Sequence, residues 1–295
     1  MRRFALSAVV VALAVAAAGC GGSSSKGSEG ATTSTSAGSC ATADLTLKTP
    51  GTLTIGTDNP AYPPWYGGTP HSPWKTSDPR SGKGYESAAA YAIAKQLGFA
   101  RDKVKWVVVP FNTSFAPGPK KFDFDINQIE YKPERARAVD FSTSYYDVSQ
   151  SLVVRKGTKI AQATSIADLK PYKLGVAIGT TSYDTIVKQI KPSQKPAVYD
   201  TNDAAVQALK VKQIDGLVVD FPTALYVTAV QVPNSEILGR FENLPGAGHF
   251  GVVLAKGSSL THCVDQAISR LRANGTLTKL QQQWLSEASG GRTLK

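Results

Sequence analysis

Residues 132–146 read KPERARAVDFSTSYY and lie where the pattern of the chain begins again. Pro133 can open a short helix, because its missing N–H costs nothing at the first helical position. The segment 124–129, just before this stretch, is predicted to form a short strand. After Phe141 a second series of strand-like and helix-like segments follows. The folded part of the chain is therefore organised as two successive series.

Each series alternates strands with helices. The first has a strand at 52–57, a helix at 85–97 that stops at Gly98, and a β-branched run at 104–109 of the kind buried on both faces of a parallel sheet. This order predicts an α/β fold with helices layered on parallel sheets. The second series is predicted to contain strands at 150–155, 173–177, 216–220 and 250–254, and helices at 182–189, 204–212, 222–230, 260–274 and 276–285.

The size of the folded part favours two lobes. About 250 residues follow from Leu45 onward, which is more than a single hydrophobic core usually holds. None of its stretches approaches the roughly 18 consecutive apolar residues of a membrane span.

The N-terminal residues predict export and lipid attachment. Arg2 and Arg3 precede an apolar run at 4–18, which is short for a membrane span and typical of a secretory signal. The Ala-Ala-Gly-Cys sequence that follows resembles a bacterial lipobox, which implies cleavage before Cys20 and diacylation of its thiol. An ordinary signal peptide with an incidental cysteine is the alternative. We therefore place a signal peptide at 1–19.

A tether is expected to follow. Residues 21–38 consist mostly of Gly, Ser, Thr and Ala, which cannot bury enough apolar surface to offset the entropy of ordering. A flexible chain of this length reaches roughly 23 Å. With the lipidated cysteine, the tether is placed at 20–44.

Charge and cysteine usage exclude several classes of protein. The net charge is +11, or +9 without Arg2 and Arg3, and the basic residues are scattered, which indicates a solvated surface rather than nucleic-acid binding. Cys40 and Cys263 remain as an even pair in an oxidising compartment, so a disulfide is expected. No CxxC motif or metal-binding Cys/His spacing is present, and the three histidines, His71, His249 and His262, are far apart in sequence. Neither a metal nor a cofactor is expected.

Several segments, taken in order, resemble the polar amino-acid-binding proteins of bacterial ABC importers, which are extracellular solute-binding proteins of family 3. Residues 132–146 match a hallmark of that family, a Pro-Glu-Arg turn followed by Asp-Phe-Ser and a Tyr pair. The resemblance spans about 51–285. The other matching segments are GTLTIGTDNPAYPPW (51–65), GKGYESAAAYAIAKQLG (82–98), KLGVAIGTTSYD (173–184), IDGLVVDFPTALY (214–226) and LRANGTLTKLQQQWL (271–285).

The resemblance implies the two-lobed periplasmic-binding-protein fold of type II, with a mainly parallel sheet flanked by helices in each lobe. Lobe 1 then comprises 45–149 and 246–295, and lobe 2 comprises 150–245. Two extended hinge segments near 149–152 and 244–248 join the lobes, and such segments can absorb backbone rotation.

The same resemblance assigns the groups that hold an amino acid. Arg135 is expected to bind the carboxylate through its planar fork, although a solvent-facing arginine like Arg137 is the alternative. Thr180 and Thr181 precede a predicted helix, where backbone N–H groups and hydroxyls suit an anion, or where they simply cap the helix. Asp220 ends an apolar strand and matches the ammonium-binding aspartate, or it caps the next helix.

Four further positions complete the expected pocket wall. Tyr62, Trp65 and Phe111 lie where the family places aromatic rings against the solute, and packing in the core is their alternative role. Asp58 follows the first strand, where relatives contact a polar or cationic side chain; a turn-forming aspartate is the alternative.

Three features depart from the family pattern. Gln128 and Glu130 occupy pocket positions that usually carry small or hydroxyl residues, and Lys132 replaces a common Thr. The loop at 66–84 is longer than usual. Glu130 either supports Arg135 or pairs with Lys132, or else faces the solute and selects an amide, guanidinium or ammonium group. The solute is therefore expected to be polar or basic.

These observations predict a lipid-anchored, extracytoplasmic receptor that binds an amino acid between closing lobes and delivers it to an ABC permease, acting as a monomer. A dehydratase on the same fold is one alternative, with Glu130 and Lys132 as acid and base. A ligand-sensing domain is another. No nucleophile–base constellation is visible, so an enzyme is not expected.

Overall fold

The computed structural model describes residues 39–244, 248–285 and 292–295. The predicted signal peptide, Cys20 and the tether up to residue 38 lie outside these residues, as does part of the second hinge segment. Among the described residues, no helix combines the length and the apolar character needed to cross a membrane.

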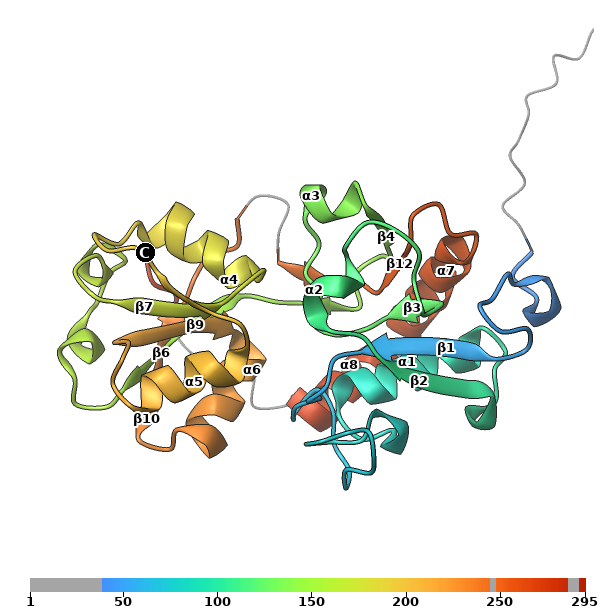
Figure 1. Cartoon of the computed structure of the whole chain (residues 1–295), viewed down its shortest axis with the longest axis horizontal. Helices are drawn as coiled ribbons and strands as arrows, with labels where there is room; N and C mark the ends of the chain where they lie inside the picture. The colour runs from blue at the N-terminus through green and yellow to red at the C-terminus, as the bar shows by residue number, and fades with distance from the viewer. Residues whose placement is uncertain (1–38, 245–247, 286–291) are drawn as a thin grey trace, which may run out of the picture. The chain divides into compact units, whose positions relative to one another are not determined.

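The first sheet has the strand order β2-β1-β3-β12-β4. Its strand β1 (Leu53–Thr57) is parallel to β2 (Val104–Val108) and β3 (Phe124–Asp125). The strand β12 (Val253–Ala255) returns from late in the chain and is antiparallel to β3 and β4 (Val139–Phe141). The sheet is flanked by α1 (Tyr85–Gln96), α2 (Phe111–Ser114), α3 (Pro133–Ala136), α7 (Leu260–Ala273) and α8 (Thr276–Leu285) (Figure 1).

The second sheet has the order β10-β6-β9-β7-β8. Its parallel part joins β9 (Gly216–Asp220), β7 (Leu174–Ala177) and β8 (Ala197–Tyr199). β6 (Gln150–Arg155) is antiparallel to β9 and to β10 (Ser235–Arg240). Its helices are α4 (Thr181–Asp184), continued by a π-helix at Thr185–Ile190, α5 (Asn202–Lys210), and α6 (Phe221–Tyr226), continued by a π-helix at Val227–Gln231.

Short elements complete the description. A two-stranded antiparallel pair, β5 (Tyr146–Asp147) and β11 (His249–Phe250), lies at the two points where the chain passes between the large sheets. The 3-10 helices are Thr42–Asp44, Pro79–Ser81, Arg101–Lys103, Lys159–Gln162 and Ala167–Leu169.

Helices cover both faces of the second sheet, which explains its apolar strands. Leu217 and Val219 of β9 pack with α5 and α6, whereas Val218 packs on the opposite face with Ile186 of the π-helix that follows α4. In the first sheet, Leu53 and Ile55 of β1 share a core with α1, α7 and α8. The alternation of strands and helices therefore does predict α/β layering.

Several expectations about the sheets need correction. Each large sheet is mixed, with two parallel and two antiparallel pairings, because β12 and β6 enter their sheets in the opposite direction. β2 is an edge strand rather than one buried on both faces, and its Val108 is 39% exposed. The strand expected at 250–254 is interrupted at Gly251, where a Cβ would lie 2.9 Å from the carbonyl oxygen of Ser142. The strands β4, β5, β8 and β10 are absent from the prediction.

The last four residues do not belong to lobe 1, where the prediction placed them. The N–H of Arg240 donates to Arg292 O at 2.8 Å, and the N–H of Leu294 donates to Arg240 O at 2.7 Å. Leu294 is 1% exposed and fills the core beside Leu238. One buried apolar side chain thus draws the C-terminus onto the second sheet.

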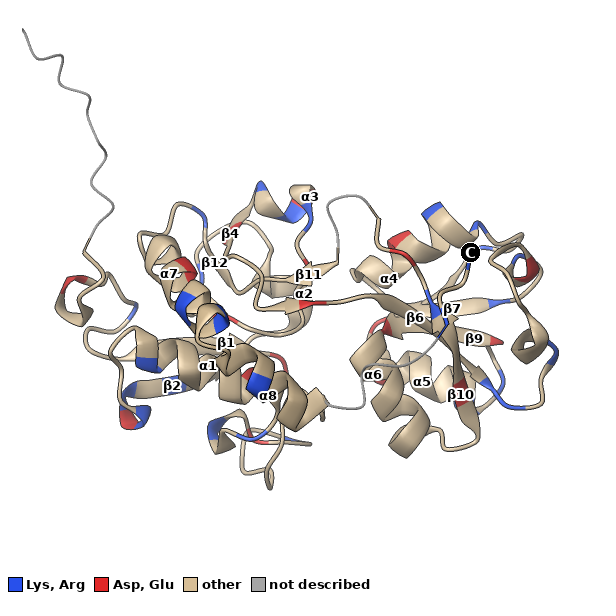
Figure 2. Ribbon diagram, turned by 180° about the vertical axis from the view of Figure 1, so that it is seen from behind, with Lys and Arg blue, Asp and Glu red and all other residues tan. Residues whose placement is uncertain are grey.

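Cys40 and Cys263 form a disulfide with a Cα–Cα distance of 5.4 Å. Cys263 lies on α7, so the bond attaches the start of the described chain to the helices of the first sheet. Figure 2 shows Lys and Arg spread over helices and loops around both sheets, rather than concentrated on one element.

Candidate functional site

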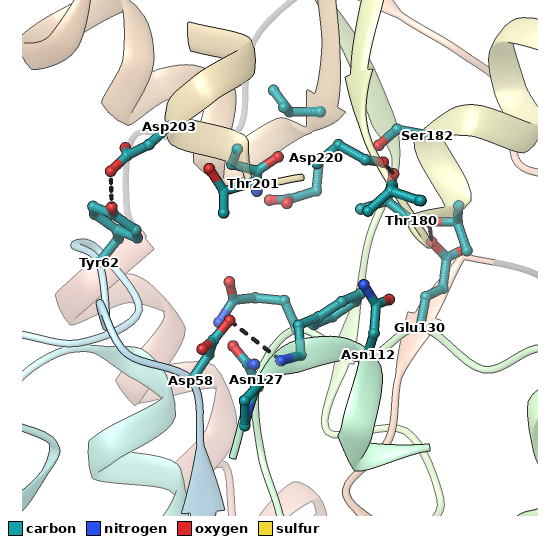
Figure 3. A pocket seen from close by; sticks show the side chains of 18 of the residues that line it. Asp58, Tyr62, Asn112, Asn127, Glu130, Thr180, Ser182, Thr201, Asp203 and Asp220 are labelled. Atoms are coloured by element: carbon teal, nitrogen blue, oxygen red, sulfur yellow. Dashed lines mark hydrogen bonds between the residues drawn. The ribbon is translucent and has the colours of Figure 1, made fainter. Parts of the chain in front are cut away.

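A cavity of about 410 Å³ lies between the two sheets, lined from both sides. The first sheet contributes the loop after β1, the start of α2, the loop after β3, and Arg135 of α3. The second contributes the ends of β7, β8 and β9, which are parallel and so present their carboxyl ends at one edge. Figure 3 shows Asp58 and Asn127 on one side of this space and Thr201 and Asp220 on the other.

The guanidinium of Arg135 spans the two sides of the cavity. It is 7% exposed, and it donates to Glu130 O of its own loop at 2.5 Å and to Gly179 O after β7 at 2.6 Å. The central carbon of the guanidinium, Cζ, lies 4.2 Å from the centroid of the Phe115 ring. Burial lowers the pKa of Arg135 to about 10, so the group remains charged at neutral pH. Arg135 therefore does not have the solvent-facing position considered as its alternative.

Asp220 faces the cavity from the end of β9. Its carboxylate accepts from the N–H and the hydroxyl of Thr223 at 3.0 and 2.9 Å, so it also caps α6. Burial raises the pKa of Asp220 to about 6, and the nearby charge of Glu130 acts in the same direction. The binding and capping roles are thus compatible in one carboxylate.

Thr180 and Thr181 border the cavity at the amino end of α4. The hydroxyl of Thr180 donates to Ala177 O at 2.8 Å, and that of Thr181 donates to the carboxylate of Glu130. Neither hydroxyl caps the helix. The helix end itself, with its backbone N–H groups, remains beside the cavity and suits an anion.

The aromatic residues separate into two groups. Tyr62 and Phe111 line the cavity, and the hydroxyl of Tyr62 donates to Asp203 across it. Trp65 does not line it: the side chain is 1% exposed and packs edge-on against Tyr146 and Phe250. The structure therefore favours the alternative role of Trp65, packing in the core, although its indole N–H also donates to the hydroxyl of Thr223 in the second lobe at 3.3 Å.

The floor of the cavity is organised by a buried glutamate. Glu86 of α1 is fully buried and accepts from the main-chain N–H of Gln128 at 2.6 Å, and also from the amide of Gln128 and the hydroxyl of Tyr145. Burial raises the pKa of Glu86 to about 7. Gln128 borders the cavity, but its side-chain amide is committed to Glu86. Asp58 lines the cavity and accepts from Phe111 N–H at 3.3 Å.

The carboxylate of Glu130 is bonded to protein groups. It accepts from Gly248 N–H at 2.6 Å, from the Thr181 hydroxyl, and from the Gln150 amide at 3.3 Å. Neither predicted ion pair is present, since Arg135 binds the main-chain oxygen of Glu130 and Lys132 pairs with Asp184.

The long loop after β1 supports the cavity wall. Trp74 is 4% exposed and packs in the core of the first lobe, and the buried Asp78 pairs with Arg80 within the loop at 2.7 Å. The guanidinium of Arg101 donates to Arg80 O at 2.7 Å, which attaches the loop to the first lobe. Asn59, a lining residue, donates to Pro73 O at 2.8 Å and accepts from Lys75 N–H at 3.1 Å.

Sequence reasoning missed several polar residues of the cavity, among them Asp203 and Asn127. Asp203 lies in the first turn of α5, shortly after β8, a strand that was not predicted, so the signal for it was lost. Asn127 precedes Gln128 in the same unusual stretch, and it is 8% exposed with its amide nitrogen unpaired among the described residues. The signal that could have identified Asn127 was its place beside Gln128, at the start of the NQIEYK stretch that departs from the family pattern.

The lining is strongly acidic. Arg135 is the single basic side chain among the described lining residues, whereas five carboxylates border the cavity. Within the described part of the chain, no cluster of three or more His, Cys, Asp or Glu side chains could hold a metal ion. The acidic residues of the lining are Asp58, Glu130, Asp200, Asp203 and Asp220.

Comparisons with known proteins assign this architecture. Residues 53–287 match the model of the bacterial extracellular solute-binding proteins, family 3, and the chain belongs to that family. The L-cystine-binding protein TcyJ of Escherichia coli (strain K12) is 29% identical over 241 residues, which cover 81% of this chain and 84% of that protein. The glutamine-binding protein GlnH of Bacillus subtilis (strain 168) is 27% identical, over 71% of this chain and 76% of its own.

Solved structures agree with this assignment. An ancestral arginine-binding protein bound to glutamine has a TM-score of 0.65 and 30% identity, covering 80% of this chain and 98% of its own. The ancestral amino acid-binding protein AncCDT-1, a precursor of cyclohexadienyl dehydratase, has a TM-score of 0.64 and 27% identity, covering 79% of this chain and 95% of its own. The fold expectation of a two-lobed periplasmic-binding-protein architecture is confirmed, and the curated relatives named here are binding proteins.

Proposed function

We propose that this chain is the extracytoplasmic receptor of an ABC importer and that it binds a polar or basic L-amino acid between its two lobes. The observation that carries the proposal is the cavity lining, whose described residues combine one basic side chain, Arg135, with five carboxylates. Arg135 suits a carboxylate, and Asp220 suits an ammonium. A volume of about 410 Å³ is within the usual range for small-molecule sites.

The remaining charges select the side chain of the amino acid. Asp58 and Asp203 add negative charge near Tyr62, so an acidic solute would be repelled and an amide or cation favoured. The relatives are named for cystine, arginine and glutamine, which supports a polar or basic ligand. Delivery to the permease follows from the class of receptor.

The dehydratase alternative is not favoured by the geometry. The carboxylate of Glu130 is bonded to Gly248, Thr181 and Gln150, and Lys132 is paired with Asp184. Lys132 is also not among the residues that line the main cavity. No acid–base pair is thus presented to a solute by these two residues.

Calorimetry with a panel of amino acids tests the proposal. Arginine, lysine, histidine, glutamine or cystine should bind tightly. Glutamate and aspartate should bind at least about tenfold more weakly, because each brings a net negative charge to a lining that contains five carboxylates. Mass spectrometry of solute that co-purifies with the protein provides an independent identification. Glutamate as the tightest ligand would contradict the selectivity, and absence of binding by every amino acid would reject the function.

Lipid anchoring is part of the proposal and rests on Cys20, which lies outside the described residues. In a bacterial host that processes lipoproteins, Cys20→Ser should move the protein from the membrane fraction to the extracytoplasmic soluble fraction, because the thiol that carries the lipid is absent. Fractionation followed by immunoblotting measures the change. A variant that stayed in the membrane fraction would show that the anchor lies elsewhere.

A further inference from the structure

A second cavity, of about 170 Å³, adjoins the main one. Three residues line both cavities: Glu130, Gln150 and Thr181. These side chains form a wall between the two spaces. Beyond the wall, Lys132 of the first lobe pairs with Asp184 of α4 in the second, so another polar contact joins the lobes on that side.

The wall is held together by direct hydrogen bonds. One carboxylate oxygen of Glu130 accepts from Gly248 N–H at 2.6 Å. The other accepts from the hydroxyl of Thr181 and from the amide of Gln150 at 3.3 Å. The amide oxygen of Gln150 accepts in turn from the hydroxyl of Ser182. Glu130 is 3% exposed, so these donors replace the water that a free carboxylate would bind.

The partners of Glu130 come from three parts of the molecule. Glu130 itself belongs to the loop between β3 and α3, and its backbone is fixed by a bridge to Phe250. Gly248 lies on a connection between the sheets, Gln150 begins β6 of the second sheet, and Thr181 begins α4 of the second lobe. The full set of bonds therefore requires the lobes to be close together.

We propose that Glu130 is a positioning residue that holds the lobes closed at the rear of the cleft. This inference rests on the proposed function and adds a role that does not involve contact with the solute. Because every partner of the carboxylate is a protein group, its contribution to closure is the same for every solute. A residue that contacted the solute would instead alter the order of preference.

The test combines calorimetry with small-angle scattering on Glu130→Gln. This variant keeps the side-chain shape and removes the charge, so the donors lose their strong acceptor. The affinities for arginine, lysine, histidine, glutamine and cystine should fall by one common factor of at least about tenfold. The radius of gyration should increase relative to the wild type, both without and with added amino acid.

Matched variants exclude a general loss of stability. Glu134→Gln removes an exposed acid that lines only the second cavity, and neither the affinities nor the radius of gyration should change. Thr181→Val removes a donor to Glu130 from the opposite lobe, and it should produce the same increase in the radius of gyration. The double variant, Glu130→Gln with Thr181→Val, should expand little further than either single variant. Thermal melting confirms that each variant is folded.

Two outcomes would overturn the inference. A changed order of preference among the amino acids would show that Glu130 contacts the solute. An unchanged radius of gyration in folded Glu130→Gln and Thr181→Val would show that the wall does not hold the lobes. If the wild type bound none of the amino acids, the proposed function would fail, while the scattering comparison would still decide the role of Glu130.

Discussion

Arg135→Ala should weaken the binding of the amino acid by at least about 30-fold, or about 2 kcal/mol. The guanidinium is buried, remains charged, and lines the cavity between the lobes. Its loss removes a charge-assisted partner of the solute carboxylate and also the bond to Gly179 O on the opposite side. Isothermal titration calorimetry at neutral pH measures the difference.

Arg137→Ala is the matched control, because Arg137 lies at the end of the same helix and is exposed. It should leave the affinity within about twofold of the wild type. Arg135→Lys keeps the charge and loses the planar fork, so its affinity should lie between those of the wild type and Arg135→Ala. A loss in Arg135→Ala no larger than in Arg137→Ala would remove Arg135 from the binding site.

Binding should weaken as the pH falls below 6, by about tenfold for each pH unit. The cause is Asp220, whose pKa is raised to about 6 by burial. Only the ionised carboxylate attracts an ammonium, so protonation of Asp220 competes with the solute. Near pH 5.5, binding should release a proton, which calorimetry detects as a heat that depends on the ionisation enthalpy of the buffer.

Asp220→Asn separates this effect from other titrating groups such as Glu86, whose pKa is also raised. The variant should bind at least about 30-fold more weakly at pH 7.5, because a buried partner of the ammonium is lost. Its affinity should then vary little between pH 5 and 7.5. A variant with the pH dependence of the wild type would assign the titration to another group.

The same carboxylate affects the stability of the free protein. Because the folded-state pKa is raised, Asp220 contributes stability that is complete below its ordinary pKa of 3.8 and is lost as the pH rises through about 6. Asp220→Asn should therefore raise the free energy of unfolding at pH 7.5, by up to about 3 kcal/mol. Denaturant titration at pH 7.5, compared with the wild type, measures the gain.

Local chemistry made much of the binding site predictable. Arg135 lies two positions after a proline that starts its helix, and Asp220 ends a strand of buried apolar residues. Both positions depend on the pattern of neighbouring residues. Asp203 could not be found in this way, because its place in the cavity depends on β8, whose short AVY sequence carries little strand signal. The burial of Trp65 could not be found in this way either, since its ring partners Tyr146 and Phe250 lie far away in the sequence.

The α/β class, the two-lobed family and the pairing of Cys40 with Cys263 follow from periodicity, ordered motifs and cysteine count, all of which can be read along the chain. The partner that each polar side chain takes is set instead by the packing of the folded molecule. Glu130 had three open roles in the sequence, and its partners Gly248 and Thr181 lie 118 and 51 positions away. The mixed direction of the sheets and the return of Leu294 to the second core were decided in the same way. Contacts between residues far apart in the chain depend on how the whole chain packs, and no local pattern encodes them.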